Sequence, residues 1–144
     1  MGTEIRLKAT SRTKKDITSG TLETKMYDGG DASLIKKYSR IHITYSIDGV
    51  GASPLEIHYK TDDNYQWKTL EPSPNNPNAI KNTHTKLKRT GGKLSTAELI
   101  IPGKAKARSI AVRLYLRITG ADGTDFKNFK LSDITFTFRT IIRK

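Results

Sequence analysis

The chain has three histidines, His42, His58 and His84, and imidazole is the side chain best suited to acid, base or metal chemistry near neutral pH. His42 and His58 fall at outward positions of two neighbouring predicted strands, so they could lie side by side on one sheet face, although we favour solvated face residues. Two histidines without a third ligand make a poor metal site. The chain also lacks a His-Glu-x-x-His motif, a nucleophile elbow and a phosphate-binding glycine loop. We therefore predict no catalytic residue, no metal ligand, no cofactor and no enzymatic activity.

Three turns bring together oxygen atoms of the kind that bind calcium in β-sandwich proteins. None of them has the regular spacing of an EF-hand loop. Turn formation alone explains their aspartates, because Asp side chains bond to nearby backbone amides, so we favour turns over structural calcium. The three groups are Asp28 with Asp31, Asp62 with Asp63 and Asn64, and Asp122 with Asp125.

The lone tryptophan, Trp67, could form a platform for a sugar, together with Tyr65 and Tyr59. An aromatic face packs against the apolar face of a pyranose, while nearby carboxylates and amides bond to its hydroxyls. A lone tryptophan in a small β-protein is more commonly part of the core. The candidate ligand-binding residues under the sugar hypothesis are Tyr59, Asp62, Asp63, Asn64 and Trp67.

Positive charge is concentrated in one stretch of a strongly basic chain. Lysine and arginine number 26 against 14 acidic residues, which gives a net charge of +12 and attraction to polyanions. The stretch 81–108 supplies +7 of this charge, but it has no aromatic residues to stack on bases. Lysines that protect edge strands from pairing are the alternative explanation. The predicted basic patch consists of Lys81, Lys86, Lys88, Arg89, Lys93, Lys104, Lys106 and Arg108.

The elements that must position these residues are best defined in the last third of the chain. From Ile110 to Ile118, an apolar residue stands at every second position, which is the period of a half-buried strand. The run from Phe129 to Phe138 changes parity across Ser132 and Asp133, which predicts a β-bulge there. The outward side chains of the first run, Arg113, Tyr115 and Arg117, suit an acidic partner, a solvated face or a subunit contact.

The rest of the chain shows the same period in shorter segments, with turns between them. We predict strands at residues 4–9, 41–47, 55–60, 65–70, 84–89 and 94–101, and one short helical turn at 32–38. Eight or nine strands at spacings of about ten residues are typical of a sandwich or barrel. We therefore predict an all-β fold, a single antiparallel jelly-roll-like β-sandwich spanning residues 1–144. Residues 1–38 form an extended or loosely packed N-terminal segment in this prediction.

Composition restricts the compartment and the type of stabilisation. The chain has no cysteine, so disulfides, thiolate–zinc sites and thiol catalysis are excluded. It has no apolar run approaching the roughly 20 residues of a membrane span, and its first residues do not resemble a signal peptide. We expect a protein made in the cytoplasm, without a membrane partner.

Several stretches together resemble a known class of domain. They are Ile41 to Tyr45, Leu55 to Asp62, Trp67 to Leu70, Ile100 to Pro102 and Phe129 to Arg139. This arrangement resembles jelly-roll-like β-sandwich domains in structural proteins of tailed bacteriophages, and its Tyr59 to Trp67 hairpin also resembles one in galactose-binding-like sandwiches. The resemblance implies a β-sandwich and no catalytic residues.

Three hypotheses about function follow. The first is a non-enzymatic structural protein of a phage virion, in the head decoration, neck or tail, made in the host cytoplasm. It would contact other virion proteins and form a homo-oligomer. The second is a carbohydrate-binding module centred on Trp67. The third is a nucleic-acid-binding β-domain that uses the basic patch.

Overall fold

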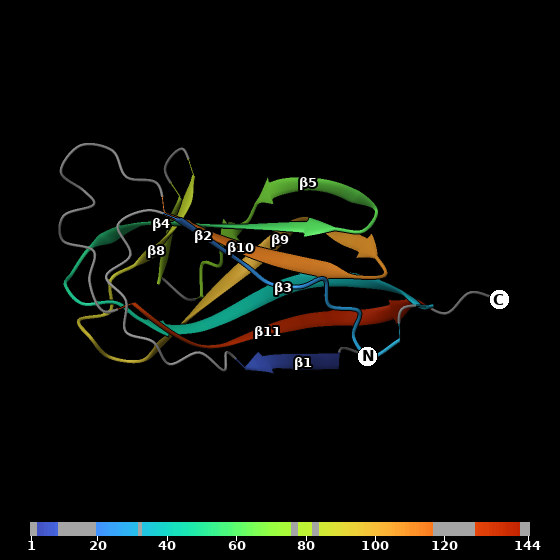
Figure 1. Cartoon of the computed structure of the whole chain (residues 1–144), viewed down its shortest axis with the longest axis horizontal. Helices are drawn as coiled ribbons and strands as arrows, with labels where there is room; N and C mark the ends of the chain where they lie inside the picture. Colours follow the sequence, from blue (N-terminus) through green and yellow to red (C-terminus); the bar gives the residue numbers. More distant parts are fainter. Residues whose placement is uncertain are drawn as a thin grey trace.

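The protein folds as two antiparallel β-sheets packed face to face (Figure 1). The computed structural model describes residues 3–8, 20–31, 33–75, 78–81, 84–116 and 129–141. Within these residues there is no helix, and hence none that is long and apolar enough to cross a bilayer. The predicted all-β sandwich is confirmed.

The five-stranded sheet is built around the longest strands. In spatial order it consists of β1 (Thr3–Lys8), β11 (Lys130–Ile141), β3 (Ile35–Ser46), β9 (Ser95–Ala107) and β6 (Glu71–Pro72). The six-stranded sheet runs in the order β2 (Gly20–Glu23), β10 (Ile110–Leu116), β4 (Ala52–Thr61), β8 (Thr85–Lys88) and β7 (Ala79–Lys81). Its sixth strand, β5 (Asn64–Thr69), pairs with β4.

Residues from the first 38 positions form edge strands in both layers. β1 pairs with β11 in one sheet, and β2 pairs with β10 in the other. Successive long strands also alternate between the sheets, from β3 to β4 and from β9 to β10 to β11, as in jelly rolls. The N-terminal strands therefore pair with the last two long strands of the chain.

The core lies between the sheets, where the alternating side chains predicted from the sequence meet. Ile41, Ile43 and Tyr45 of β3 are fully buried, and Ile110 and Val112 of β10 are buried in the same cluster. Burial of one such aliphatic side chain contributes about 1.5–3 kcal/mol. The alternating period is therefore the main determinant of the fold.

The predicted bulge in the last strand is present. The pairing of β11 with β3 shifts register between Leu131 and Asp133, which returns Ile134 and Phe136 to the core side. The Phe136 ring stacks on Tyr27 at 5.9 Å and meets the edge of Tyr38 at 6.5 Å. The bulge thus keeps both halves of a parity-shifted strand on one buried face.

The predicted helical turn at 32–38 is wrong, because β3 already begins at Ile35. Lys36 and Tyr38, two positions apart, both point inward, and the Lys36 Nζ atom donates to the carbonyls of Leu34 and Arg108. The turn before this strand has Gly29 at a φ of 71°, where a Cβ atom would meet Lys36 and Phe138 at 3.0 Å. Tertiary packing therefore overrides the local helical preference.

Candidate functional site

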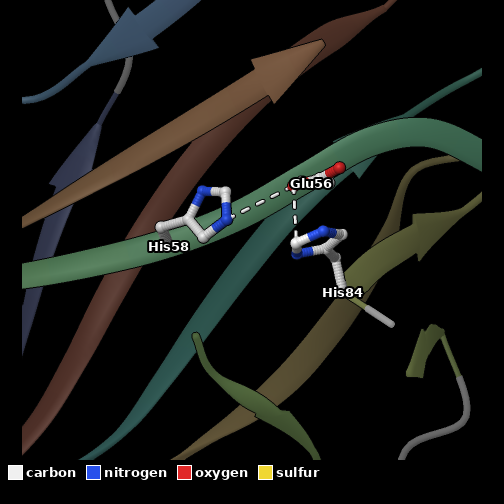
Figure 2. Close-up of side chains that lie close together, drawn as sticks. All are labelled: Glu56, His58 and His84. Atoms are coloured by element: carbon white, nitrogen blue, oxygen red, sulfur yellow. Dashed lines mark ion pairs between the residues drawn. The ribbon is translucent and has the colours of Figure 1, made fainter. Parts of the chain in front are cut away.

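The chemically richest cluster lies on the outer face of the six-stranded sheet. Along β4, Leu55, Ile57 and Tyr59 point into the core, so Glu56 and His58 point to the opposite face. His84, immediately before β8, completes the group, and Figure 2 shows both imidazoles beside the Glu56 carboxylate. Glu56 is 0% exposed, whereas the His84 side chain is 37% exposed. The three side chains form what we call the Glu56 cluster.

One carboxylate oxygen faces both imidazoles. The Glu56 Oε1 atom lies 3.4 Å from His58 Nε2 and 3.7 Å from His84 Nδ1, and one potential ligand atom from each residue lies within 4.8 Å of the others. Bonds of 2.0–2.1 Å in a tetrahedral zinc site place neighbouring ligand atoms roughly 3.3 Å apart. The residue types and spacing are therefore close to those of a three-ligand metal site.

The second nitrogen of His58 argues against such a site. His58 Nδ1 lies 3.3 Å from Arg113 Nη2 and 3.4 Å from its Nε, and a guanidinium can only donate. Nδ1 is therefore the acceptor, so a neutral His58 carries its proton on Nε2, directed at Glu56. A metal ligand would need the opposite tautomer, with its second N–H donated to an acceptor. The surroundings of the Glu56 cluster therefore do not fit a metal centre, and the Glu56 Oε1 atom lies in electrostatic contact with the two imidazoles.

A row of cations and aromatic rings continues along the same face. Arg113 lies over the Trp67 ring at 4.9 Å and over the Tyr115 ring at 5.3 Å, and Lys60 lies over Trp67 at 4.6 Å. Cation–π contacts at such sites contribute about 0.5–2 kcal/mol each. Arg113 thus links the half-buried Trp67 to the Glu56 cluster.

The residues predicted to bind a sugar do not gather around Trp67. Tyr59 points into the core, and the Asp62 carboxylate accepts the backbone N–H groups of Arg108 and Ser109, each at 2.9 Å. Asp63 is exposed in the β4–β5 turn, and the Asn64 side chain lies outside the described residues. Tyr65 is 70% exposed. Carbohydrate binding therefore stays a prediction. The Trp67 ring on which a sugar would stack is already in contact with the side chains of Lys60 and Arg113.

The predicted basic patch is divided between the two sheets. Lys81, Lys86 and Lys88 belong to β7 and β8 of one sheet, whereas Lys104 and Lys106 belong to β9 of the other. Arg89 donates to the carbonyls of Ala52 and Asp48, and Lys81 pairs with Glu71 at 3.3 Å. Lys93 and Arg108 lie outside the strands and are exposed. Closeness in sequence therefore does not place these cations on one sheet.

The expected pairing of His42 with His58 is wrong, since β3 and β4 belong to different sheets. His42 instead lies 2.9 Å from the Glu98 carboxylate, which Arg40 also approaches at 3.5 Å. A hydrogen bond from Ser73, followed by the contacts with His42 and Arg40, lowers the pKa of Glu98 below its ordinary value of 4.5 despite partial burial. Periodicity predicted outward positions for both histidines but could not assign their sheets.

The lowered pKa of Glu98 predicts an acid-dependent loss of stability. A carboxyl group with a lower pKa when folded stabilises the protein above its unfolded pKa, and this contribution is lost as the pH falls through the folded pKa. We expect Glu98→Gln to lower the free energy of unfolding by about 1–2 kcal/mol at pH 7. Urea unfolding at pH 7 and at pH 3 should show the difference shrinking in acid. An equal difference at both pH values would refute the role of the charge.

Comparisons with known proteins add one structural likeness. No family model matches the chain, and no curated protein matches it. Among solved structures, the chain is similar to the coat protein of tobacco streak virus, solved as a dimer, with 13% sequence identity and a TM-score of 0.47. The match covers 99% of this chain and 88% of the coat protein chain.

Proposed function

We propose that this chain is a non-enzymatic structural protein of a virion, of the tailed-phage type, that acts through contacts with copies of itself and with other virion proteins. The proposal rests on the strands that contain the residues of the sequence resemblance. The β4–β5 hairpin contains Tyr59 and Trp67, and β11, the last described strand, contains Phe138 and Arg139. Both belong to one two-sheet sandwich, and this supports the fold that the sequence resemblance implies.

The strand edges support the same proposal. In each layer an N-terminal strand occupies an edge: β1 has six paired positions with β11, and β2 has four with β10. Edge strands expose a second row of backbone donors and acceptors, and contacts between identical edges generate closed symmetric oligomers. Subunit contacts along these edges and along the flat sheet faces suit a protein that assembles with copies of itself.

The oligomeric state tests this proposal. We expect size-exclusion chromatography with light scattering on the full chain, from about 5 to 200 µM, to give one defined oligomer. Negative-stain images should show closed particles of uniform size. Deleting residues 1–8 should change the subunit number while circular dichroism still shows a β-rich fold. A strict monomer over the whole concentration range would overturn the proposal.

A further inference from the structure

Strand pairing aligns three cations across the outer face of the five-stranded sheet. Lys37 on β3 is the direct pairing partner of Lys106 on β9 and of Arg139 on β11. Directly opposed residues point to the same face, and the next residue, Tyr38, is buried in the core. Lys37 is partly exposed, while Lys106, Arg139 and the nearby Lys104 are exposed. We call these four residues the cation row.

The cation row has no neutralising partner among the described residues. None of its four side chains lies within ion-pair distance of a carboxylate in that part of the chain. Asp62 and Asp63 line one pocket with Lys106, and the Asp62 carboxylate accepts two backbone amides. Like charges placed directly opposite on neighbouring strands destabilise a sheet. The fold therefore tolerates an uncompensated positive surface.

Electrostatics within the row agree with this geometry. The charge of Lys104 is the largest cause of a lowered pKa for Lys37, and partial burial, Arg139 and Lys106 lower it further. An anion on this face would relieve the repulsion among all four cations. The cation row is therefore a surface on which a bound anion would stabilise the folded protein.

A large irregularity in the β3–β9 pairing makes this part of β9 unsuited to pairing with an added strand. Only Ser39 of β3 stands opposite the four residues from Ile101 to Lys104, and Lys104 has a φ of 58°. A non-glycine residue in this conformation costs about 1–2 kcal/mol. Pro102 also lacks a backbone donor. Two of the three exposed side chains between residues 101 and 107, those of Lys104 and Lys106, are cationic.

We propose that the cation row binds the phosphate backbone of single-stranded nucleic acid without reading its sequence. Phosphates recur along every such strand, and arginine and lysine match them by fork geometry and by charge. The row spans three neighbouring strands, about 10 Å, and its four side chains end in cationic groups, whereas the apolar residues beside it, Ile35 and Ile141, are only partly exposed. This contact is separate from the subunit contacts proposed above and does not depend on them.

The test uses two triple variants with equal charge. One is Lys37→Gln with Lys106→Gln and Arg139→Gln, and the control is Lys25→Gln with Lys68→Gln and Lys130→Gln at exposed sites outside both the row and the predicted basic patch. Each lowers the net charge from +12 to +9 by removing three positive charges. The probe is a fluorescein-labelled 20-nucleotide poly(dT) strand, with fluorescence anisotropy measured between 50 and 300 mM NaCl.

We expect the row variant to bind at least about tenfold more weakly at 50 mM NaCl and the control within about threefold of the original chain. For the row variant only, the negative slope of log K against log salt should become shallower by about 2, since three phosphate contacts are lost and each contributes about 0.7. Melting curves check folding, and the row variant should melt no lower than the original chain because repulsion has been removed. If it melts lower, the single variants Lys106→Gln and Lys68→Gln replace the two triple variants, with about a threefold loss expected for Lys106→Gln and no measurable loss for Lys68→Gln.

Three results would overturn the proposal. The first is an equal loss of binding in both triple variants, which would indicate attraction by net charge alone. The second is no binding of poly(dT) by the original chain at 50 mM NaCl. The third is tighter binding of poly-glutamate than of poly(dT), with the loss confined to the row variant, which would assign the row to an acidic protein segment.

Discussion

Replacing Lys36 with methionine is expected to lower the free energy of unfolding by about 3–5 kcal/mol, because it removes the charged donor of three hydrogen bonds to backbone carbonyls. The Lys36 side chain is 1% exposed, and its Nζ atom donates to the carbonyls of Leu34 at 2.9 Å, Arg108 at 3.0 Å and Asp31. These bonds connect the turn before β3 to the segment between β9 and β10. Methionine keeps the length of the side chain but provides no donor.

The adjacent residue provides the control for this prediction. Lys37→Met removes the same charge one position along β3, on the outer face and beside three other cations. We expect it to change the free energy of unfolding by no more than about 0.5 kcal/mol, or to increase it slightly. Urea unfolding followed by Trp67 fluorescence measures both variants. Similar values for the two would refute the structural role assigned to Lys36.

Replacing Glu56 with glutamine is expected to lower the free energy of unfolding by about 2–3 kcal/mol at pH 7. The carboxylate is fully buried, and its Oε1 atom lies 3.4 Å from His58 and 3.7 Å from His84, so the neutral amide weakens two electrostatic contacts. Because glutamine has nearly the same shape, little of the loss can be attributed to packing. Urea unfolding at pH 7 measures the difference.

Glu98→Gln is the matched control, because Glu98 also pairs with a histidine but lies on the other sheet and is partly exposed. We expect the cost at Glu56 to exceed that at Glu98 by at least about 1 kcal/mol. Zinc provides a second readout. A melting temperature that rises with added zinc in the original chain, but not in Glu56→Gln, would contradict the tautomer assigned to His58 and identify a metal site.

The strand pattern was predictable because alternation is a local property. Ile41, Ile43 and Tyr45 alternate with polar residues, and a two-residue period places one side of a strand in a core whichever strand pairs with it. The β11 bulge was predictable for the same reason, since only an extra residue near Ser132 and Asp133 could keep both apolar sets buried. The helical turn at 32–38 failed because Lys36 and Tyr38 both point inward from a strand, where Lys36 also bonds to the carbonyl of Arg108, 72 positions away.

The candidate sites were less predictable, because each depends on pairing between distant segments. His58 and His84 lie 26 positions apart, and only the β4–β8 pairing brings both to the Glu56 carboxylate. The basic residues from 81 to 108 suggested one patch, yet the strands that contain them belong to different sheets. The sequence signal for Glu56 was weak, since an acidic residue at an alternate strand position normally faces solvent.

By itself, the amino-acid sequence determined an all-β chain with a large positive charge, because side-chain period and charge are properties of neighbouring residues. Only the tertiary structure decided that Lys37, Lys106 and Arg139 share one face and that His42 and His58 do not. The reason is physical: sheet membership and register depend on backbone pairing between residues that can be a hundred positions apart. A one-residue change of register turns a strand over, so function on a sheet face depends on register as much as on residue type.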